Sequence, residues 1–324
     1  MKIIMYGNRG SSALGASDNS PFAKFGGDTT CVGIVFDDGT LISLDAGSGF
    51  WKWPYTLKKL LGNEGPYNMN LFFSHYHLDH TMGLAQSLLL FNEKNKINVY
   101  GGDFYPGLET MFYENANRPQ NPDLSNHYKA EISFDTLGRS DKHKTVTLDN
   151  GACVKWKYNP HGPGEESIGY RIDHEGKSFA FITDTDHKFD ESDTPILDSE
   201  LVDFIKDCDA LLYDCHFSDK ELDETPDMRN YGHSTGEHGV RLCKAANIPM
   251  LITSHHNPFK DDPAMDSLTR QFRRYGALNN VFVFPAMPSL CLDLNLHPSQ
   301  RQKHLSMQQK PQQRWKTISG VLPQ

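Results

Sequence analysis

The chain has 324 residues, of which 38% are hydrophobic and 23% charged, and its formal net charge is −9 at pH 7. This composition excludes a disordered chain, and the length allows two domains or one large α/β layered fold. The negative charge disfavours general nucleic-acid binding, because an acidic body repels phosphate unless basic residues gather locally.

The N-terminal residues MKIIMYGNRGSS predict a short strand that ends at Gly7. They do not resemble a signal peptide, which needs roughly 7–15 consecutive apolar residues and a small-residue cleavage site. The longest apolar run, Leu88–Phe91, has the size of a core segment and is far shorter than a membrane span. The six cysteines include no C-x-x-C pair. We therefore expect reduced thiols in a cytoplasmic protein that does not bind membranes.

Short β-branched or aromatic runs recur along the chain and predict about a dozen strands. The runs are Lys2–Tyr6, Thr30–Phe36, Leu41–Leu44, Asn70–Phe73, Ile97–Tyr100, Val154–Tyr158, Ile168–Ile172, Ser178–Ile182, Ala210–Tyr213, Met250–Thr253, Val281–Phe284 and Leu290–Leu294. Helical patterns lie at Trp53–Leu61, Thr81–Asn92, Tyr105–Asn115, Ser199–Lys206, Thr235–Ala246 and Pro263–Tyr275. Together they predict an α/β layered protein. The polar stretch 116–147 is expected to be an irregular lid or a substrate-side insertion.

Four potential metal ligands follow the strand predicted at Asn70–Phe73, in the run His75-Tyr76-His77-Leu78-Asp79-His80. In an extended chain His75 and His77 point to the same side. A helix that begins near Asp79 would turn Asp79 and His80 toward a neighbouring point. One turn therefore offers two imidazoles to one metal ion, and a carboxylate and an imidazole to another. A surface histidine cluster is a poor alternative, because the run directly follows a strand of buried type.

Three later strands also end at potential ligands. His161 follows Val154–Tyr158, Asp184 follows Ser178–Ile182, and the pair His255-His256 follows Met250–Thr253. Strand-end loops on one edge of a sheet converge, and α/β folds place their chemistry there. Any one of these residues alone would be more typical of a turn or a helix cap, but the series indicates one site.

This order of motifs resembles the metallo-β-lactamase superfamily of metal-dependent hydrolases. A strand that ends at Asp45 (LISLDAGSG), the HxHxDH run, a later His, a later Asp and a last His appear in that superfamily's order, from Met1 to about residue 293. A closer likeness to the branch of tRNA 3′-end endonucleases and related phosphodiesterases lies in four segments. They are Gly7-Asn8-Arg9-Gly10-Ser11, Gly26-Gly27-Asp28-Thr29-Thr30-Cys31, Gly232-His233-Ser234-Thr235 and His255-His256-Asn257-Pro258.

The resemblance implies a four-layer αβ/βα sandwich that binds two divalent metal ions. Ligands of this kind suit Zn²⁺, and Mn²⁺ or Fe would also fit them. The implied ligands of one ion are His75, His77 and His161. Those of the other are Asp79, His80 and His255, with Asp184 bridging both ions and His256 as an alternative to His255. Asp45 is expected to orient the ligand turn.

The resemblance also implies a mechanism, in which a hydroxide that bridges the ions attacks phosphorus. Asp79 would orient this hydroxide, and His233 would protonate the leaving alkoxide. The alternative for His233 is a residue at a helix entry, with Ser234 or Thr235 as the N-cap. His216 is expected to be an ordinary strand-end histidine, and His187 an ordinary polar position.

The predicted function is an enzyme, a metal-dependent phosphodiesterase acting on a small or cyclic phosphodiester. A tRNA 3′-end endonuclease is the nearest rival function, but such enzymes carry a Gly- and Pro-rich arm that this sequence lacks. A lactone or thioester hydrolase would use the same metal site, and a metal-stabilised regulatory module would keep the metals without catalysis. Members of the resembled branch are often dimers, so a homodimer is expected.

The C-terminal segment differs from the rest in composition. Residues 296–324 carry a charge of +5 and are rich in Gln, whereas the remaining residues sum to −14. We predict a hydrolase domain over residues 1–295 and a flexible, solvated tail over 296–324. The alternative is that Trp315 and its basic neighbours dock on the acidic body or on a partner.

Overall fold

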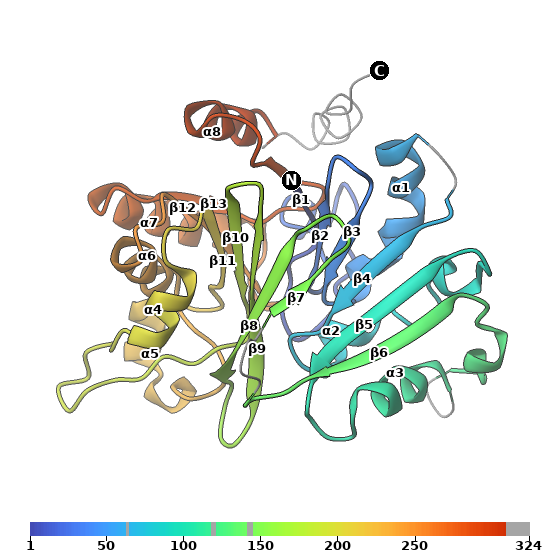
Figure 1. Cartoon of the computed structure of the whole chain (residues 1–324). Coiled ribbons are helices and arrows are strands. Elements are labelled where there is room, and N and C mark those ends of the chain that lie inside the picture. Colours follow the sequence, from blue (N-terminus) through green and yellow to red (C-terminus); the bar gives the residue numbers. More distant parts are fainter. Residues whose placement is uncertain (63–64, 118–120, 141–144, 309–324) are drawn as a thin grey trace. The chain divides into compact units, whose positions relative to one another are not determined.

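The computed structural model describes residues 1–62, 65–117, 121–140 and 145–308. These residues form two compact units, each with its own seven-stranded sheet (Figure 1). Unit 1 comprises residues 1–18, 26–138 and 287–308, and unit 2 comprises residues 19–25 and 139–286.

The sheet of unit 1 has the order β14-β1-β2-β3-β4-β5-β6. Its strands are β1 (Lys2–Gly7), β2 (Cys31–Val35), β3 (Leu41–Leu44), β4 (Asn68–Phe72), β5 (Lys96–Gly102), β6 (Glu131–Leu137) and β14 (Cys291–Asp293). Strands β14, β1, β2 and β3 pair antiparallel, and β3 to β6 pair parallel. Because β3 and β4 are parallel neighbours, Leu44 lies opposite Phe72 and both strands end at the same edge.

The described part of unit 1 also contains helices, and some of them add apolar side chains to its core. They are η1 (Ser48–Lys52), α1 (Trp53–Leu61), α2 (Leu78–Thr81), η2 (Leu88–Phe91), α3 (Leu108–Ala116), η3 (Leu124–His127) and α8 (Pro298–Met307). Trp53, Leu57 and Leu60 of α1 recur at helical spacing and are buried in the core with Leu71 and Val99 of the sheet.

The sheet of unit 2 has the order β13-β12-β11-β10-β9-β8-β7. Its strands are β7 (Thr145–Thr147), β8 (Cys153–Pro160), β9 (Glu166–His174), β10 (Lys177–Ile182), β11 (Ala210–Asp214), β12 (Met250–Ser254) and β13 (Phe282–Pro285). Strands β7 to β10 pair antiparallel, and β10 to β13 pair parallel. The helices are α4 (Ser199–Ile205), α5 (Asp219–Glu224), η4 (Pro226–Met228), α6 (Gly236–Ala245) and α7 (Asp262–Leu278).

The parallel strands of unit 2 position its polar residues. Every residue of β11 and β12 is buried, which is typical of a strand covered on both faces. Ile182 of β10 lies opposite Tyr213, and Asp214 lies opposite Ser254. Asp214 is the last residue of β11, and Asp184 and His255 follow the ends of β10 and β12. The three residues therefore lie along one edge of the sheet.

The helix predicted at Thr81–Asn92 is wrong. The helix α2 already ends at Thr81, because the next turn hydrogen-bonds elsewhere: Gly83 N–H donates to the carbonyl of Ala46 at 2.9 Å. A Cβ at Gly83 would lie 2.1 Å from the Gly47 carbonyl oxygen, so only glycine permits this close approach. The apolar run that looked helical instead forms the short η2.

The irregular insertion predicted at 116–147 is also wrong for the described residues of that stretch. It contains η3, the short β7 and the seven-residue β6, which pairs with β5 along its whole length. In β6 only Ile132, Phe134 and Leu137 turn away from solvent, so its apolar content is low. Such alternation is the pattern of a half-exposed edge strand.

The first part of the predicted tail is a helix. Pro298–Met307 forms α8, and the Arg301 side chain is 2% exposed. Its Nη2 donates to the Leu294 carbonyl at 2.6 Å, and its Nε donates to the Leu296 carbonyl at 2.7 Å. Trp315 and the basic residues beyond 308 lie outside the described residues, and the boundary predicted at 295 stays a prediction.

Among the described residues, the structure contains no helix with the length and hydropathy to cross a membrane.

Candidate functional site

The ligand turn of unit 1 is built around Asp45, which follows β3 and is fully buried. Its Oδ1 accepts the Ser74 N–H at 2.7 Å, and its Oδ2 accepts the Ser74 hydroxyl at 2.8 Å and the His80 Nδ1–H at 2.7 Å. Burial raises the pKa of Asp45, and the hydrogen bonds from His80 and Ser74 oppose that rise. These three bonds support the orienting role expected for Asp45, which stays a prediction.

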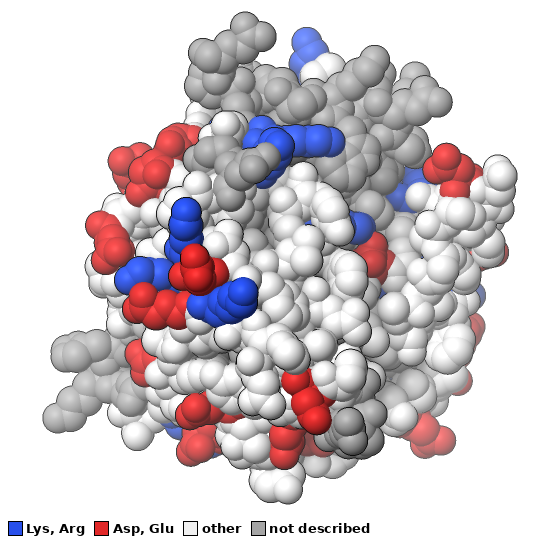
Figure 2. Space-filling model, turned by 90° about the vertical axis from the view of Figure 1, so that its right-hand side faces the viewer, with Lys and Arg blue, Asp and Glu red and all other residues white. Residues whose placement is uncertain are grey.

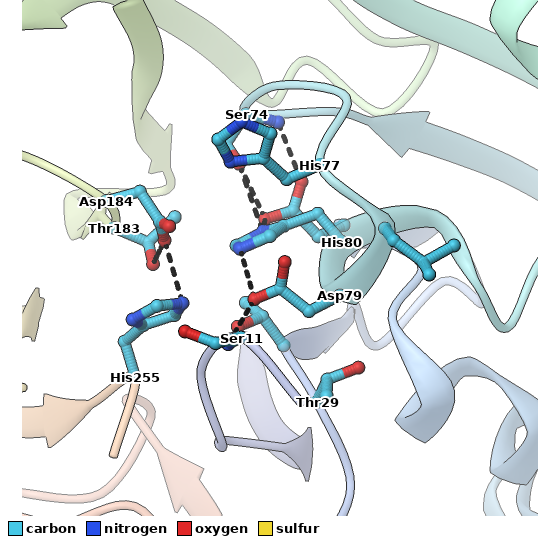
Figure 3. A network of polar contacts seen from close by, with 12 residues as sticks. Ser11, Thr29, Ser74, His77, Asp79, His80, Thr183, Asp184 and His255 are labelled. Atoms are coloured by element: carbon cyan, nitrogen blue, oxygen red, sulfur yellow. Dashed lines mark hydrogen bonds and ion pairs between the residues drawn. The ribbon is translucent and has the colours of Figure 1, made fainter. Parts of the chain in front are cut away.

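The contact between Asp45 and His80 fixes how His80 can act. With its proton on Nδ1, neutral His80 carries a lone pair on Nε2, which is the form that ligates a metal. That Nε2 lies 3.3 Å from Asp79 Oδ2, which also accepts the Ser11 N–H at 2.7 Å (Figure 3). Two acceptors at this distance repel one another unless a metal ion or a proton lies between them.

The other two predicted ligands of unit 1 lie beside His80. The ring centroids of His75 and His80 are 4.2 Å apart, and those of His75 and His77 are 4.5 Å apart. His75 is 4% exposed and its Nδ1 lies 3.1 Å from the Ser74 hydroxyl, whereas His77 is exposed. The four potential ligands of the HxHxDH run therefore lie close together in unit 1.

Asp184 is the centre of the predicted ligands of unit 2. Its backbone is left-handed, with φ 48°, and its side chain is 2% exposed. Oδ1 lies 3.2 Å from His255 Nε2, and Oδ2 lies 3.7 Å from His161 Nε2. Each carboxylate oxygen therefore faces a different imidazole, as a carboxylate that bridges two ions would.

His161 is held in the same tautomer as His80. Its Nδ1–H donates to the Gly232 carbonyl at 2.8 Å, since a carbonyl oxygen can only accept. The lone pair of neutral His161 is therefore on Nε2, facing Asp184. The two units repeat one arrangement, a buried imidazole anchored at Nδ1 with a carboxylate oxygen close to Nε2. These imidazole and carboxylate donors fit a divalent metal ion.

The structure also separates His255 from His256. His256 is fully buried, and its Nε2 donates to the Ala286 carbonyl at 3.0 Å. His255, with φ 54°, places Nε2 beside Asp184 (Figure 3). These contacts favour His255 as the ligand and a structural role for His256.

His233 is supported by a carboxylate that the sequence analysis missed. Its Nδ1 lies 3.0 Å from Oδ2 of Asp214, which is fully buried at the end of β11. The N-cap of α6 is Thr235, one of the two N-caps expected, and its hydroxyl accepts the His238 N–H at 3.0 Å. His233 therefore lies two residues before the cap, and its catalytic role stays a prediction. Asp214 could have been found as the strand-end acid that follows Asp184 one strand later.

His216 belongs to the same cluster, although the sequence indicated an ordinary strand-end histidine. Its ring stacks on that of His233, with centroids 4.4 Å apart and an interplanar angle of 10°. Its Nδ1 lies 3.2 Å from the His255 carbonyl oxygen. One nitrogen each of His216, His233 and His255 lies within 4.8 Å of the other two.

Comparisons with known proteins agree with this chemistry. The model of the Beta-lactamase superfamily domain matches residues 68–256, which is more than half of the chain and includes all seven predicted ligands. Ribonuclease Z of Thermoplasma volcanium is 23% identical over 313 residues, covering 84% of this chain and 93% of that protein.

Three similar solved structures have TM-scores of about 0.6. Zinc-bound PqqB of Methylobacterium extorquens has a TM-score of 0.64 at 16% identity, covering 91% of this chain and 100% of that one. The short form of human tRNase Z has a TM-score of 0.60 at 16% identity, and the match covers 91% of this chain and 100% of that one. A diphosphatase of the PhnP family has a TM-score of 0.59 at 17% identity, and the match covers 91% of this chain and 98% of that one.

Because the solved structures are all less than 25% identical to this chain, their similarity shows the fold alone. It confirms the predicted αβ/βα sandwich class. The family match and the ribonuclease Z relative support a metal-dependent hydrolase. The chain belongs to the metallo-β-lactamase superfamily, and a ribonuclease Z is among its relatives.

Proposed function

We propose that this protein is a phosphodiesterase that hydrolyses a small or cyclic phosphodiester with the help of two divalent metal ions, Zn²⁺ by ligand type. The proposed ligands are His75, His77 and His161 for one ion and Asp79, His80 and His255 for the other, with Asp184 shared. When bound, the ions would polarise a phosphoryl oxygen and lower the pKa of a water, so that hydroxide is available as the nucleophile near neutral pH. Their four positive charges exceed the charge of Asp79 and Asp184, so the site would attract a phosphodiester anion.

The observation that carries the proposal is the Asp214–His233 pair. The ring of His233 lies 4.8 Å from that of the proposed ligand His255, and its side chain is 10% exposed. Asp214 holds the Nδ1 proton and stabilises the protonated ring, so Nε2 is the atom that would donate a proton. An alkoxide leaving from phosphorus needs such a proton, whereas the thiolate that leaves from a thioester depends on it less.

Asp79 has the second catalytic role in this proposal. Its Oδ2 accepts the Ser11 N–H, which fixes the rotation of the carboxylate. A carboxylate held in this way can accept a hydrogen bond from the attacking water and orient it toward phosphorus.

A tRNA 3′-end endonuclease is the second candidate, because the matched relative is named ribonuclease Z and a similar structure is a tRNase Z. The charges favour a small substrate. On the face shown in Figure 2, one group of described Lys and Arg side chains lies among Asp and Glu side chains. Several basic side chains form ion pairs, including Lys96–Glu131, Lys155–Asp173, Lys157–Asp198 and Arg229–Asp193. Paired cations attract a polyanion weakly.

We also propose a cytoplasmic location and a homodimer. All six cysteines are free, as a reducing compartment would require.

An activity screen tests the proposed function. Chelator-stripped protein reconstituted with Zn²⁺ or Mn²⁺ is offered cyclic mononucleotides, cyclic dinucleotides, precursor tRNA, a lactone and a thioester. We expect turnover of a cyclic or small phosphodiester that a chelator abolishes and metal restores. Turnover of precursor tRNA alone would support the second candidate. Turnover of the carbon esters alone would contradict both.

A further inference from the structure

We propose that Asp186 and His187 are positioning residues that hold the loop 232–234 on both sides of His233 and keep His161 in its ligand tautomer. Both residues follow the proposed ligand Asp184 at the end of β10. The effect on His233 rests on the proposed function, whereas the effect on His161 rests on metal binding alone.

Asp186 ties two loops together through their main chains. Its Oδ1 accepts the Gly232 N–H at 2.8 Å, and its Oδ2 accepts the Gly162 N–H at 2.7 Å. Both glycines are left-handed, with φ 90° at Gly232 and 71° at Gly162. A Cβ at Gly232 would lie 2.4 Å from His161 Nδ1, so the loop can approach His161 only with glycine there.

This connection reaches the proposed metal ligand His161. Asp186 holds the N–H of Gly232, and the carbonyl of the same residue accepts the His161 Nδ1–H at 2.8 Å. The position of that carbonyl keeps the proton on Nδ1 and the lone pair on Nε2. Outer partners of this kind are worth roughly 10–100-fold in metal affinity or activity at other metal sites.

His187 holds the loop on the other side of His233. It is 6% exposed, and its Nδ1 lies 2.8 Å from the Ser234 hydroxyl. The Tyr213 hydroxyl donates to the same Ser234 oxygen at 3.0 Å, so this hydroxyl contacts both Tyr213 and His187. The His187 ring also stacks on His238, with centroids 4.1 Å apart and an angle of 13°.

His233 is thus fixed at three points. Asp186 anchors the residue before it, His187 anchors the residue after it, and Asp214 anchors its ring. A proton donor must lie within a few tenths of an ångström of its productive position, because small displacements lower the rate steeply. Asp186 and His187 would therefore act on the rate through His233 without contacting the substrate.

The test uses Asp186→Asn with Asp190→Asn as its matched control. Asparagine has one acceptor oxygen, and its amide would face the second N–H donor. Asp190 lies in the same segment and also accepts two backbone N–H groups, of Ser192 at 2.8 Å and Thr194 at 3.0 Å, but within its own turn. Both groups bind Oδ1 of Asp190, so an asparagine can keep both bonds with its one amide oxygen, whereas Asp186→Asn loses one of its two. Asp190→Asn therefore controls for the loss of one negative charge in this segment.

Two readouts are measured on each variant. Titration of Zn²⁺ against a chelator should show about tenfold weaker binding in Asp186→Asn and unchanged binding in Asp190→Asn. The kcat on an alkyl phosphodiester should fall roughly 10–100-fold in Asp186→Asn with little change in KM, and fall less on a nitrophenyl ester. If Asp186→Asn shows the same Zn²⁺ affinity and the same dependence of kcat on the leaving group as Asp190→Asn, the proposed role of Asp186 is wrong.

His187→Phe provides the second variant, because phenylalanine keeps the stacking on His238 and loses the bond to Ser234. We expect a lower kcat on the alkyl ester with unchanged Zn²⁺ affinity. Wild-type kcat in this variant would overturn the role of His187. The Zn²⁺ titration needs no substrate. Weaker binding in Asp186→Asn would therefore support the effect of Asp186 on His161 even if the wild-type protein hydrolyses no phosphodiester.

Discussion

At the scale of residues, three proposed site residues share a left-handed backbone. The φ angles are 60° at Asp45, 48° at Asp184 and 54° at His255, and each residue lies just beyond the end of a strand. For residues other than glycine this conformation costs about 1–3 kcal/mol and persists only where the surroundings hold it. Here the hydrogen bonds at Asp45 and the parallel neighbours of β10 and β12 hold it. The sharp turn aims each side chain at the strand-end edge.

The bridging position of Asp184 leads to the first prediction. Asp184→Ala removes oxygens that face both His161 and His255, whereas His161→Ala removes a ligand of one ion. By elemental analysis, we expect Asp184→Ala to lose most of both ions and His161→Ala to keep about one. Equal metal content in the two variants would show that Asp184 does not bridge.

The second prediction concerns His233. Loss of a general acid should lower kcat of His233→Ala by roughly 10²–10⁴-fold on an alkyl phosphodiester. The loss should be much smaller with a nitrophenolate leaving group, which needs little protonation, and metal content should stay unchanged. The exposed His127, changed to Ala, is the control. Equal losses on both substrates would indicate a structural role.

The third prediction is a pH dependence of stability. Burial lowers the pKa of His187 from 6.5 to about 4, with the nearby Arg241 acting in the same direction. The unfolded chain therefore takes up this proton first, so the stabilisation is complete above pH 6.5 and is lost as the pH falls toward 4. At pH 4.5 the loss should be roughly 2–3 kcal/mol.

Urea unfolding of metal-free protein at pH 7.5 and 4.5 measures this loss. The His187→Phe variant lacks the titrating group, so its stability should fall less between the two pH values. An equal fall in both proteins would show that His187 does not cause it.

At the scale of elements, the sequence predicted best where burial is continuous. The apolar runs of β10, β11 and β12 can be recognised as strands because both faces are covered, and their ends carry the proposed ligands. The edge strand β6 was missed because half of its side chains face solvent. The helix expected at Thr81–Asn92 was wrong because the tertiary contact of Gly83 with Ala46 overrides local periodicity.

The supporting residues were harder to predict than the ligands. The HxHxDH run has a spacing that local geometry can interpret. Asp186 and His187 act through main-chain groups of Gly162 and Gly232 and through Ser234, far away in sequence. A carboxylate that accepts two distant N–H groups leaves no periodic pattern, so only the folded chain shows its role.

The helix α8 gives the fourth prediction. The Gln308 side chain accepts the Cys291 N–H at 2.9 Å and donates to the Cys291 carbonyl at 2.8 Å, which satisfies the edge of β14. Truncation after residue 295 removes this pairing and the bonds of Arg301, so we expect the Tm to fall by several degrees. Truncation after 308 keeps both and should leave the Tm unchanged.

Thermal unfolding of the two truncated chains makes the comparison. Every proposed ligand precedes residue 295, so both chains should keep turnover within a few-fold at a temperature where they are folded. A Tm that both truncations leave unchanged would show that α8 does not stabilise β14.

At the scale of the whole molecule, the proposed ligands come from both units. His75, His77, Asp79 and His80 belong to unit 1, and His161, Asp184 and His255 belong to unit 2. Ions that bind only the folded chain stabilise it by mass action.

A metal-dependent phosphodiesterase must lose its turnover with its metal, so metal loading is measured together with turnover. Protein purified without chelator is analysed for metals, stripped, and reloaded with Zn²⁺ or Mn²⁺ in steps while hydrolysis of a cyclic phosphodiester is followed. We expect about two ions per chain at full loading, and turnover that is absent in the stripped protein and returns as the ions bind. Fewer than about half an ion per chain that added Zn²⁺ or Mn²⁺ cannot raise, or equal turnover with and without metal, would contradict the proposed function.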